Sequence, residues 1–197
     1  MKTKNQSSTD HPIDISHRDT NFAAKVAQRS GVNINLCWHC QSCAGGCPFV
    51  SAMDYPPNRV IRLIQLGLRQ EALESSGIWI CVGCNTCSIQ CPNAIDIPAV
   101  NDALREMAIE EGGLVAEPDI LNFHKEVLHS IERYGRTHKF EIMLRYKLRR
   151  HDWFSDASVG LKMFAKPKLE LLPCRSKDMK SIKGLFESKQ TVLLDAK

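Results

Sequence analysis

Apolar residues recur at helical spacing in several segments of the chain. Phe22 and Val26 lie about one turn apart within residues 19–29, which predicts a short amphipathic helix. Residues 57–74 have a proline in the first turn and are followed by Gly77, so they predict one or two helices. The expected buried side of this segment consists of Val60, Ile61, Ile64, Leu68 and Leu73.

Two further helices are predicted downstream. One begins at Pro98 behind the capping residue Asp96 and ends at Gly112. The other spans residues 118–134 and stops at Gly135. The residues expected to face inward are Val100, Leu104, Met107 and Ala108 in the first, and Ile120, Phe123, Val127, Leu128 and Ile131 in the second. The pattern therefore predicts a mainly α protein.

Composition favours one compact core with appendages. The chain has 197 residues, of which 43% are hydrophobic and 24% charged. Its net charge of +4 is too small to imply a nucleic-acid partner. Residues 60–68, the most apolar long stretch, are interrupted by Arg62 and Gln65, so we expect no membrane span. The first ten residues contain no apolar run of a secretory signal, and we expect a cytoplasmic protein.

The chain also has nine cysteines. A reducing compartment keeps cysteines as thiols, so closely spaced ones indicate metal ligands. Eight of them form two copies of the pattern C-x2-C-x2-C-x3-C-P, displaced by 44 positions. The copies comprise Cys37, Cys40, Cys43 and Cys47, and Cys81, Cys84, Cys87 and Cys91. This is the spacing of bacterial two-cluster ferredoxins, in which the fourth cysteine of a run ligates the other cluster.

We therefore predict two [4Fe–4S] clusters with crossed ligands. The first cluster is assigned to Cys37, Cys40, Cys43 and Cys91, and the second to Cys81, Cys84, Cys87 and Cys47. Structural zinc and a single cluster with spare cysteines are the alternatives. A tetrahedral zinc site makes the third cysteine of each run superfluous. Cys174 stands apart from both runs, and we interpret it as an ordinary thiol.

Residues beside the ligands have two interpretations each. Trp38, Ile78, Trp79, Ile80 and Ile89 either shield the clusters from water or simply pack in the core. His39 is either a hydrogen-bonding partner that tunes a cluster or an inert surface side chain.

The predicted organisation has three parts. Residues 1–30 form a polar lead-in, residues 31–113 an α-helical ferredoxin domain with two clusters, and residues 114–197 a helical extension with a partner-docking arm. Within the extension, residues 133–151 are rich in Lys and Arg with interleaved aromatics. Such a stretch could bind nucleic acid, but a solvated basic helix, or one that docks on an acidic partner, is commoner. We predict no nucleic-acid partner.

The chain resembles the C subunit of heterodisulfide reductase. Besides the cysteine runs, the resemblance is carried by Ala-Gly-Gly-Cys-Pro at 44–48, Pro-Pro-Asn-Arg at 56–59, and Trp-Ile-Cys-Val-Gly-Cys-Asn-Thr-Cys at 79–87. Tyr-Gly-Arg at 134–136 and Leu-Lys-Met at 161–163 are also similar. The resemblance implies an iron–sulfur subunit that relays electrons from an A-type subunit with flavin and iron–sulfur clusters to a B-type subunit with CCG motifs, which reduces a disulfide.

On this interpretation the chain is a non-catalytic part of an oxidoreductase complex. It has no adjacent cysteine pair and no glycine-rich nucleotide fingerprint, so we assign it no catalytic residue. Two alternatives are an iron–sulfur subunit of a fumarate reductase or glycolate oxidase-like dehydrogenase, and a stand-alone ferredoxin. Residues 1–36 lack the cysteines of an added [2Fe–2S] domain, and the long extension argues against a diffusing ferredoxin. A cluster-containing DNA-binding regulator is a further alternative.

Overall fold

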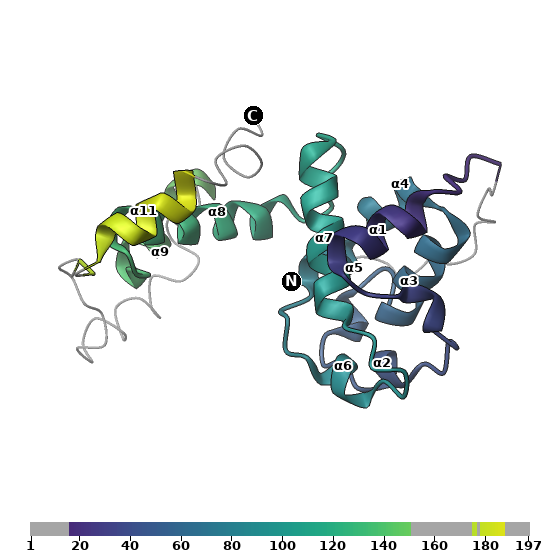
Figure 1. The fold of residues 1–197 in the computed structure, drawn as a ribbon. Helices are drawn as coiled ribbons and strands as arrows, with labels where there is room; N and C mark the ends of the chain where they lie inside the picture. Colours follow the sequence, from purple (N-terminus) through teal and green to yellow (C-terminus); the bar gives the residue numbers. More distant parts are fainter. Residues whose placement is uncertain (1–15, 151–174, 177, 188–197) are drawn as a thin grey trace. The chain divides into compact units, whose positions relative to one another are not determined.

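Helices and helical turns make up all the regular secondary structure that the computed structural model describes, in residues 16–150, 175–176 and 178–187 (Figure 1). The predicted mainly α fold is confirmed. The chain divides into two units, Met1–Glu117 and Pro118–Lys197. None of the helices in the described ranges is long and apolar enough to cross a membrane. The predictions for Cys174 and for residues 161–163 lie outside the described ranges.

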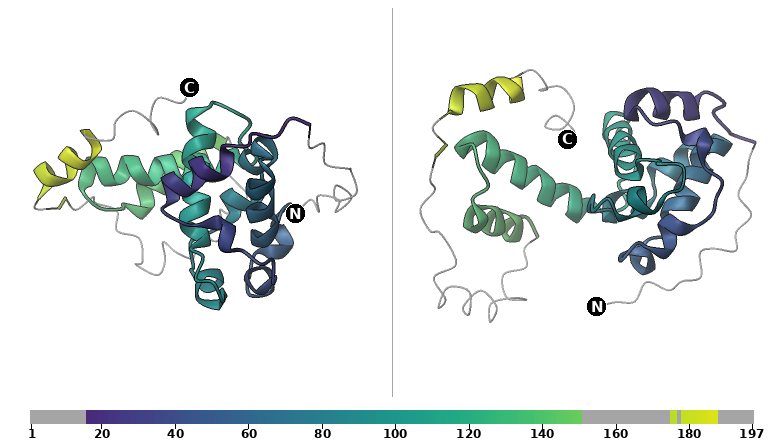
Figure 2. Two further views of the ribbon diagram at one scale, coloured as in Figure 1. Left: turned by 45° about the vertical axis from the view of Figure 1, so that its right-hand side comes forward. Right: turned by 60° about the horizontal axis from the view of Figure 1, so that its bottom comes forward.

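The first unit contains seven α-helices and two 3-10 turns within its described part. In chain order they are α1 (Phe22–Ser30), η1 (Ile34–Leu36), α2 (Ser42–Gly45), η2 (Val50–Ala52), α3 (Pro57–Leu66), α4 (Arg69–Leu73), α5 (Ser76–Ile80), α6 (Thr86–Gln90) and α7 (Ile97–Glu110). The helices α1, α4 and α5 all pack against α7, and α3 packs against α1 and α4 (Figure 2). The α3 and α7 helices are thus the two elements against which most of the unit packs.

The predicted apolar faces of α3 and α7 form the core of this unit. Every residue expected to face inward from 57–74 and from α7 is buried. The α1 helix adds Phe22 and Val26, both fully buried, although it precedes residue 31, where the predicted ferredoxin domain begins. Its packing against α7 and α3 places it inside the first unit.

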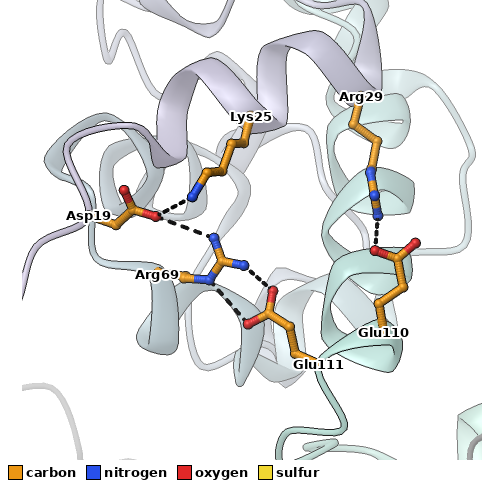
Figure 3. A network of polar contacts seen from close by, with 6 residues as sticks. All are labelled: Asp19, Lys25, Arg29, Arg69, Glu110 and Glu111. Atoms are coloured by element: carbon orange, nitrogen blue, oxygen red, sulfur yellow. Dashed lines mark hydrogen bonds and ion pairs between the residues drawn. The ribbon is translucent and has the colours of Figure 1, made fainter.

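A network of charged side chains also holds α1 in place (Figure 3). Arg69 pairs with Glu111 and, at 3.4 Å, with Asp19, while its guanidinium lies 5.5 Å from the centre of the Phe22 ring. Lys25 pairs with Asp19 at 3.0 Å. The Arg69 side chain thus contacts Asp19 before α1, Phe22 on α1 and Glu111 after α7.

The chain entering α1 also rests directly on the turn that ends α3. Gly67 has φ of 75°, and its carbonyl accepts a hydrogen bond from the Asp19 N–H at 2.8 Å. A Cβ atom at this position would lie 2.5 Å from the Asp19 carbonyl oxygen. Both the left-handed backbone and the close approach require glycine here.

The second unit consists of α8 (Pro118–Tyr134), α9 (Lys139–Arg150) and α11 (Met179–Glu187) within its described part. Both α9 and α11 pack against α8. Of the residues predicted to face inward in α8, Phe123 is exposed and the other four are half-buried, while the buried residues are the polar Glu126 and Ser130. Glu126 pairs with Arg149 at 3.0 Å, and Ser130 Oγ accepts a hydrogen bond from the backbone N–H of His138 at 2.8 Å. These partners allow polar side chains to occupy the buried side.

Candidate iron–sulfur site

The two cysteine runs adopt the same local backbone conformation. His39 in the first run and Gly83 in the second have φ of 57° and 65°, and Gln41 and Asn85 have φ of 65° and 59°. The members of each pair are separated by 44 positions, like the cysteines themselves. A one-turn helix follows in each run, α2 in the first and α6 in the second, and these two helices pack against each other. The sequence repeat is therefore also a structural repeat.

Each run also repeats a hydroxyl beside its second cysteine. The Cys40 thiol lies 3.4 Å from Ser42 Oγ, and the Cys84 thiol lies 3.4 Å from Thr86 Oγ1. Hydrogen bonding with these hydroxyls and with the neighbouring backbone lowers the pKa of both exposed thiols. These hydrogen bonds thus favour the thiolate form of the second cysteine in each run, and the thiolate is the form that binds metal.

The third cysteine of each run lies deeper. Cys43 and Cys87 are each only 8% exposed. Burial, and next the nearby Cys37 thiol, raise the pKa of Cys43 to about 11; burial and next Cys81 raise the pKa of Cys87. Several buried thiolates without a cation would repel one another, so these sites favour a positively charged metal group.

The eight cysteines surround two separate pockets. One is lined by Cys37, Cys40, Cys43 and Cys91, and we call it the first thiol pocket. The other, the second thiol pocket, is lined by Cys81, Cys84, Cys87 and Cys47. Each pocket thus combines three cysteines of one run with the fourth cysteine of the other. Ile97 lines both pockets, so an apolar side chain lies between them.

The lining of each thiol pocket offers four thiols to a metal group. Among the residues that the structure describes, no three His, Cys, Asp or Glu side chains are placed to hold a single metal ion. Zinc at about 2.3 Å from each sulfur would require sulfurs only about 3.8 Å apart. Four cysteines around an apolar pocket instead fit the four iron corners of a cubane, each of which takes one thiolate. That the eight cysteines are ligands remains a prediction.

Two polar side chains hold the backbone that enters the second run. Arg105 of α7 donates from Nε to the Ile78 carbonyl at 2.6 Å and from its guanidinium to the Cys81 carbonyl. Asp54 accepts hydrogen bonds from the backbone N–H groups of Ser76 and Gly77 at 2.8 and 3.0 Å, at the start of α5. Neither residue is predicted from the sequence, because no local spacing marks it.

His39 lies next to a predicted ligand rather than free on the surface. Its Nδ1 is 3.9 Å from Cys37 Sγ, and its Nε2 is 2.7 Å from Gln65 Oε1. Gln65 donates from Nε2 to the Ile34 carbonyl at 3.0 Å, so its Oε1 is left to accept from His39. His39 is thus half-buried and hydrogen-bonded, and a role in tuning a cluster remains a prediction.

The apolar neighbours of the cysteines fall into two groups. Ile78 and Trp79 are 0% and 2% exposed and pack in the core, as one of the two interpretations expected. Trp38 and Ile89 are 73% and 83% exposed, and Trp38 also lines the first thiol pocket.

Comparisons with known proteins agree with this geometry. Residues 33–95 match the family described as a 4Fe–4S dicluster domain. The chain is 29% identical over 94 residues to the C subunit of the H2:CoB–CoM heterodisulfide,ferredoxin reductase of Methanothermobacter thermautotrophicus, covering 48% of this chain and 51% of that protein. It is 32% identical over 81 residues to the iron–sulfur C subunit of the CoB–CoM heterodisulfide reductase of Methanopyrus kandleri, covering 41% and 42%.

A third relative is the C subunit of the ferredoxin:CoB–CoM heterodisulfide reductase of Methanosarcina mazei, 32% identical over 88 residues, with 45% of this chain and 54% of that protein covered. The chain thus spans about half the length of the curated relatives it matches. The predicted resemblance is confirmed, and the helical region around the cysteines matches a 4Fe–4S dicluster domain.

Proposed function

We propose that this 4Fe–4S protein carries two clusters and serves as the electron-relay subunit of a heterodisulfide reductase-like complex. The observation that carries the proposal is the composition of the two thiol pockets. Each is lined by four cysteines, three from its own run and one from the other. This grouping supports the assignment of Cys37, Cys40, Cys43 and Cys91 to one cluster and Cys81, Cys84, Cys87 and Cys47 to the other.

The chain's own residues supply ligands, position and surroundings. A bound [4Fe–4S] cluster supplies one-electron redox chemistry. The hydroxyls of Ser42 and Thr86 lie where they can donate hydrogen bonds to the thiolates of Cys40 and Cys84. Because Ile97 lines both thiol pockets, the pockets are separated by little more than side chains, which favours electron exchange between them.

The partners are part of the proposal. The relatives are named as C subunits of larger reductases, which supports neighbouring subunits here. We assign the donor to an A-type subunit with flavin and iron–sulfur clusters and the acceptor to a B-type subunit with CCG motifs. This chain has no adjacent cysteine pair, so the disulfide-reducing chemistry is assigned to the B-type subunit. We place the complex in a reducing compartment such as the cytoplasm, because the thiols must stay available for iron.

Anaerobic native purification of the tagged chain tests this function. Mass spectrometry should find a CCG-containing partner and a flavoprotein, and iron and sulfide analysis should give about eight of each per chain, as two cubanes require. Recovery with a fumarate reductase-type flavoprotein, or recovery alone as a stable monomer, would contradict the assignment to a heterodisulfide reductase-like complex. A Cys174→Ser variant is the matched control, and its iron content should equal that of the wild type.

A further inference from the structure

Each thiol pocket is lined by one asparagine from the helix that leaves its main run, and the cysteine pattern does not explain this residue. Asn93, which also lines the first thiol pocket, donates a hydrogen bond to the Leu36 carbonyl. Asn58 of α3 lines the first thiol pocket, and Asn101 of α7 lines the second. They follow Cys47 by eleven residues and Cys91 by ten, on the helix that leaves each run. The two asparagines thus occupy nearly equivalent positions in the repeat, each at the pocket formed mainly by its own run.

Both side chains hold a buried polar atom without a partner. The Oδ1 atoms of Asn58 and Asn101 are shielded from solvent and accept no hydrogen bond, and Asn101 as a whole is 4% exposed. In the described part of the chain, only two other buried side-chain nitrogen or oxygen atoms lack a hydrogen-bond partner, Trp79 Nε1 and Glu126 Oε2. Buried polar atoms nearly always find a partner, so an unpartnered amide oxygen position at each of two pockets indicates that a binding partner belongs there.

The chemistry of the amide identifies that partner. The oxygen and nitrogen of an asparagine amide exchange places on a half-turn of the side chain, and the nitrogen carries two donors. Sulfides and cysteine thiolates only accept hydrogen bonds. We propose that the side-chain amides of Asn58 and Asn101 each donate a hydrogen bond to a sulfur atom of the cluster in their own pocket, and so raise its reduction potential.

This inference rests on the proposed function only in that the pockets hold clusters. Reduction adds negative charge to a cluster, so a donor aimed at its sulfur stabilises the reduced form more than the oxidised form. Since Asn58 lines only the first thiol pocket and Asn101 only the second, the two effects are separable. Asn58 should act on the cluster of Cys37, Cys40 and Cys43, and Asn101 on the cluster of Cys81, Cys84 and Cys87.

Redox titration of the anaerobically purified full chain, followed by EPR, tests the proposal. Asn58→Leu and Asn101→Leu keep the approximate shape and remove the donor. Each should lower the ratio of reduced to oxidised cluster about tenfold at a fixed potential, a shift of about 59 mV for one electron, in its own cluster only. The matched control Asn35→Leu makes the same change at an exposed asparagine and should leave both potentials unchanged. Unshifted potentials in both test variants would overturn the proposal.

A second measurement covers the case in which a variant fails to assemble its cluster. Wild-type protein labelled with 15N at asparagine side chains should show a nitrogen coupling to the reduced clusters in pulsed EPR. The coupling should lose one component in Asn58→Gln or Asn101→Gln, whose longer side chain moves the amide. A wild-type spectrum without side-chain nitrogen coupling would refute the inference, whatever proteins purify with the chain.

Discussion

Replacing Asp54 with asparagine should destabilise the backbone that enters the second cysteine run. The carboxylate accepts four hydrogen bonds, from the backbone N–H groups of Tyr55, Ser76 and Gly77 at 2.6, 2.8 and 3.0 Å and from the Ser75 hydroxyl at 2.9 Å. Three of these donors lie at the start of α5, which leads directly into Cys81. Asp54 therefore acts as a cap supplied from a distant part of the chain.

The size of the effect follows from these contacts. Losing a helix cap costs about 1 kcal/mol, and each hydrogen bond to a charged group contributes about 1.5–3 kcal/mol before allowance for solvent. The carboxylate is partly exposed, which reduces its share, and Ser75 Oγ also accepts from the Gly77 N–H at 3.1 Å. We therefore expect the free energy of unfolding to fall by about 2 kcal/mol, which corresponds to unfolding that is up to about 30-fold faster.

The pH dependence has a definite sign. Burial alone would raise the pKa of Asp54, but the hydrogen bonds from Ser76, Tyr55, Ser75 and Gly77 outweigh it and hold the pKa below its ordinary value of 3.8. A carboxyl with a lowered pKa stabilises the folded state at pH values above the unfolded pKa, and the contribution is lost as the pH falls through the folded value. The difference between the wild type and Asp54→Asn should thus be constant between about pH 6 and 8.

The assay is the rate at which the cluster absorbance disappears in urea with an iron chelator under argon. Cluster loss makes unfolding irreversible, so a rate replaces an equilibrium constant. Glu106→Gln is the matched control, because it removes an α7 carboxylate that caps no helix, and its rate should match the wild type. A rate for Asp54→Asn equal to that of the wild type, or a difference that vanishes between pH 6 and 8, would show that Asp54 does not hold α5.

Four further substitutions test other contacts. Phe22→Ala removes a fully buried ring and should cost about 3–5 kcal/mol, seen as faster cluster loss and easier proteolysis before residue 31; unchanged rates would place α1 outside the core. Gly67→Ala should cost about 2 kcal/mol or more in the same assay, because its φ is 75° and its Cβ would lie 2.5 Å from the Asp19 carbonyl oxygen. Cys91→Ser should damage the EPR signal of the first thiol pocket and Cys47→Ser that of the second; loss of the signal of the variant's own run would contradict crossed ligation.

Helical periodicity predicted the core of the first unit correctly, because both α3 and α7 bury one continuous face. Val60, Ile61 and Ile64 lie on one side of α3, and Val100 and Leu104 on one side of α7, as their spacing requires. The fold class followed from the same pattern. Spacing alone also predicted a helix over residues 19–29, where the structure has α1.

The spacing of apolar residues did not predict the contacts in which a polar side chain pairs with a particular partner. In α8 the buried positions are Glu126 and Ser130, which a search for apolar residues passes over. Arg105 reaches carbonyls that precede it by 27 and 24 positions, and Asp54 caps a helix that begins 22 positions later. Such pairs depend on the folded path of the chain, so no local signal marks them.

These long-range contacts all help to hold the two cysteine runs next to each other. Each thiol pocket takes its fourth cysteine from the other run, so neither pocket is complete until both runs are in place. The α3 helix leaves the first run, and α7, which leaves the second, begins with Ile97, a residue that lines both pockets. Arg105 fixes the second run to α7, and α1 packs against both α3 and α7. With crossed ligands, binding of one cluster orders the fourth ligand of the other, and the two sites should therefore fill together rather than one at a time.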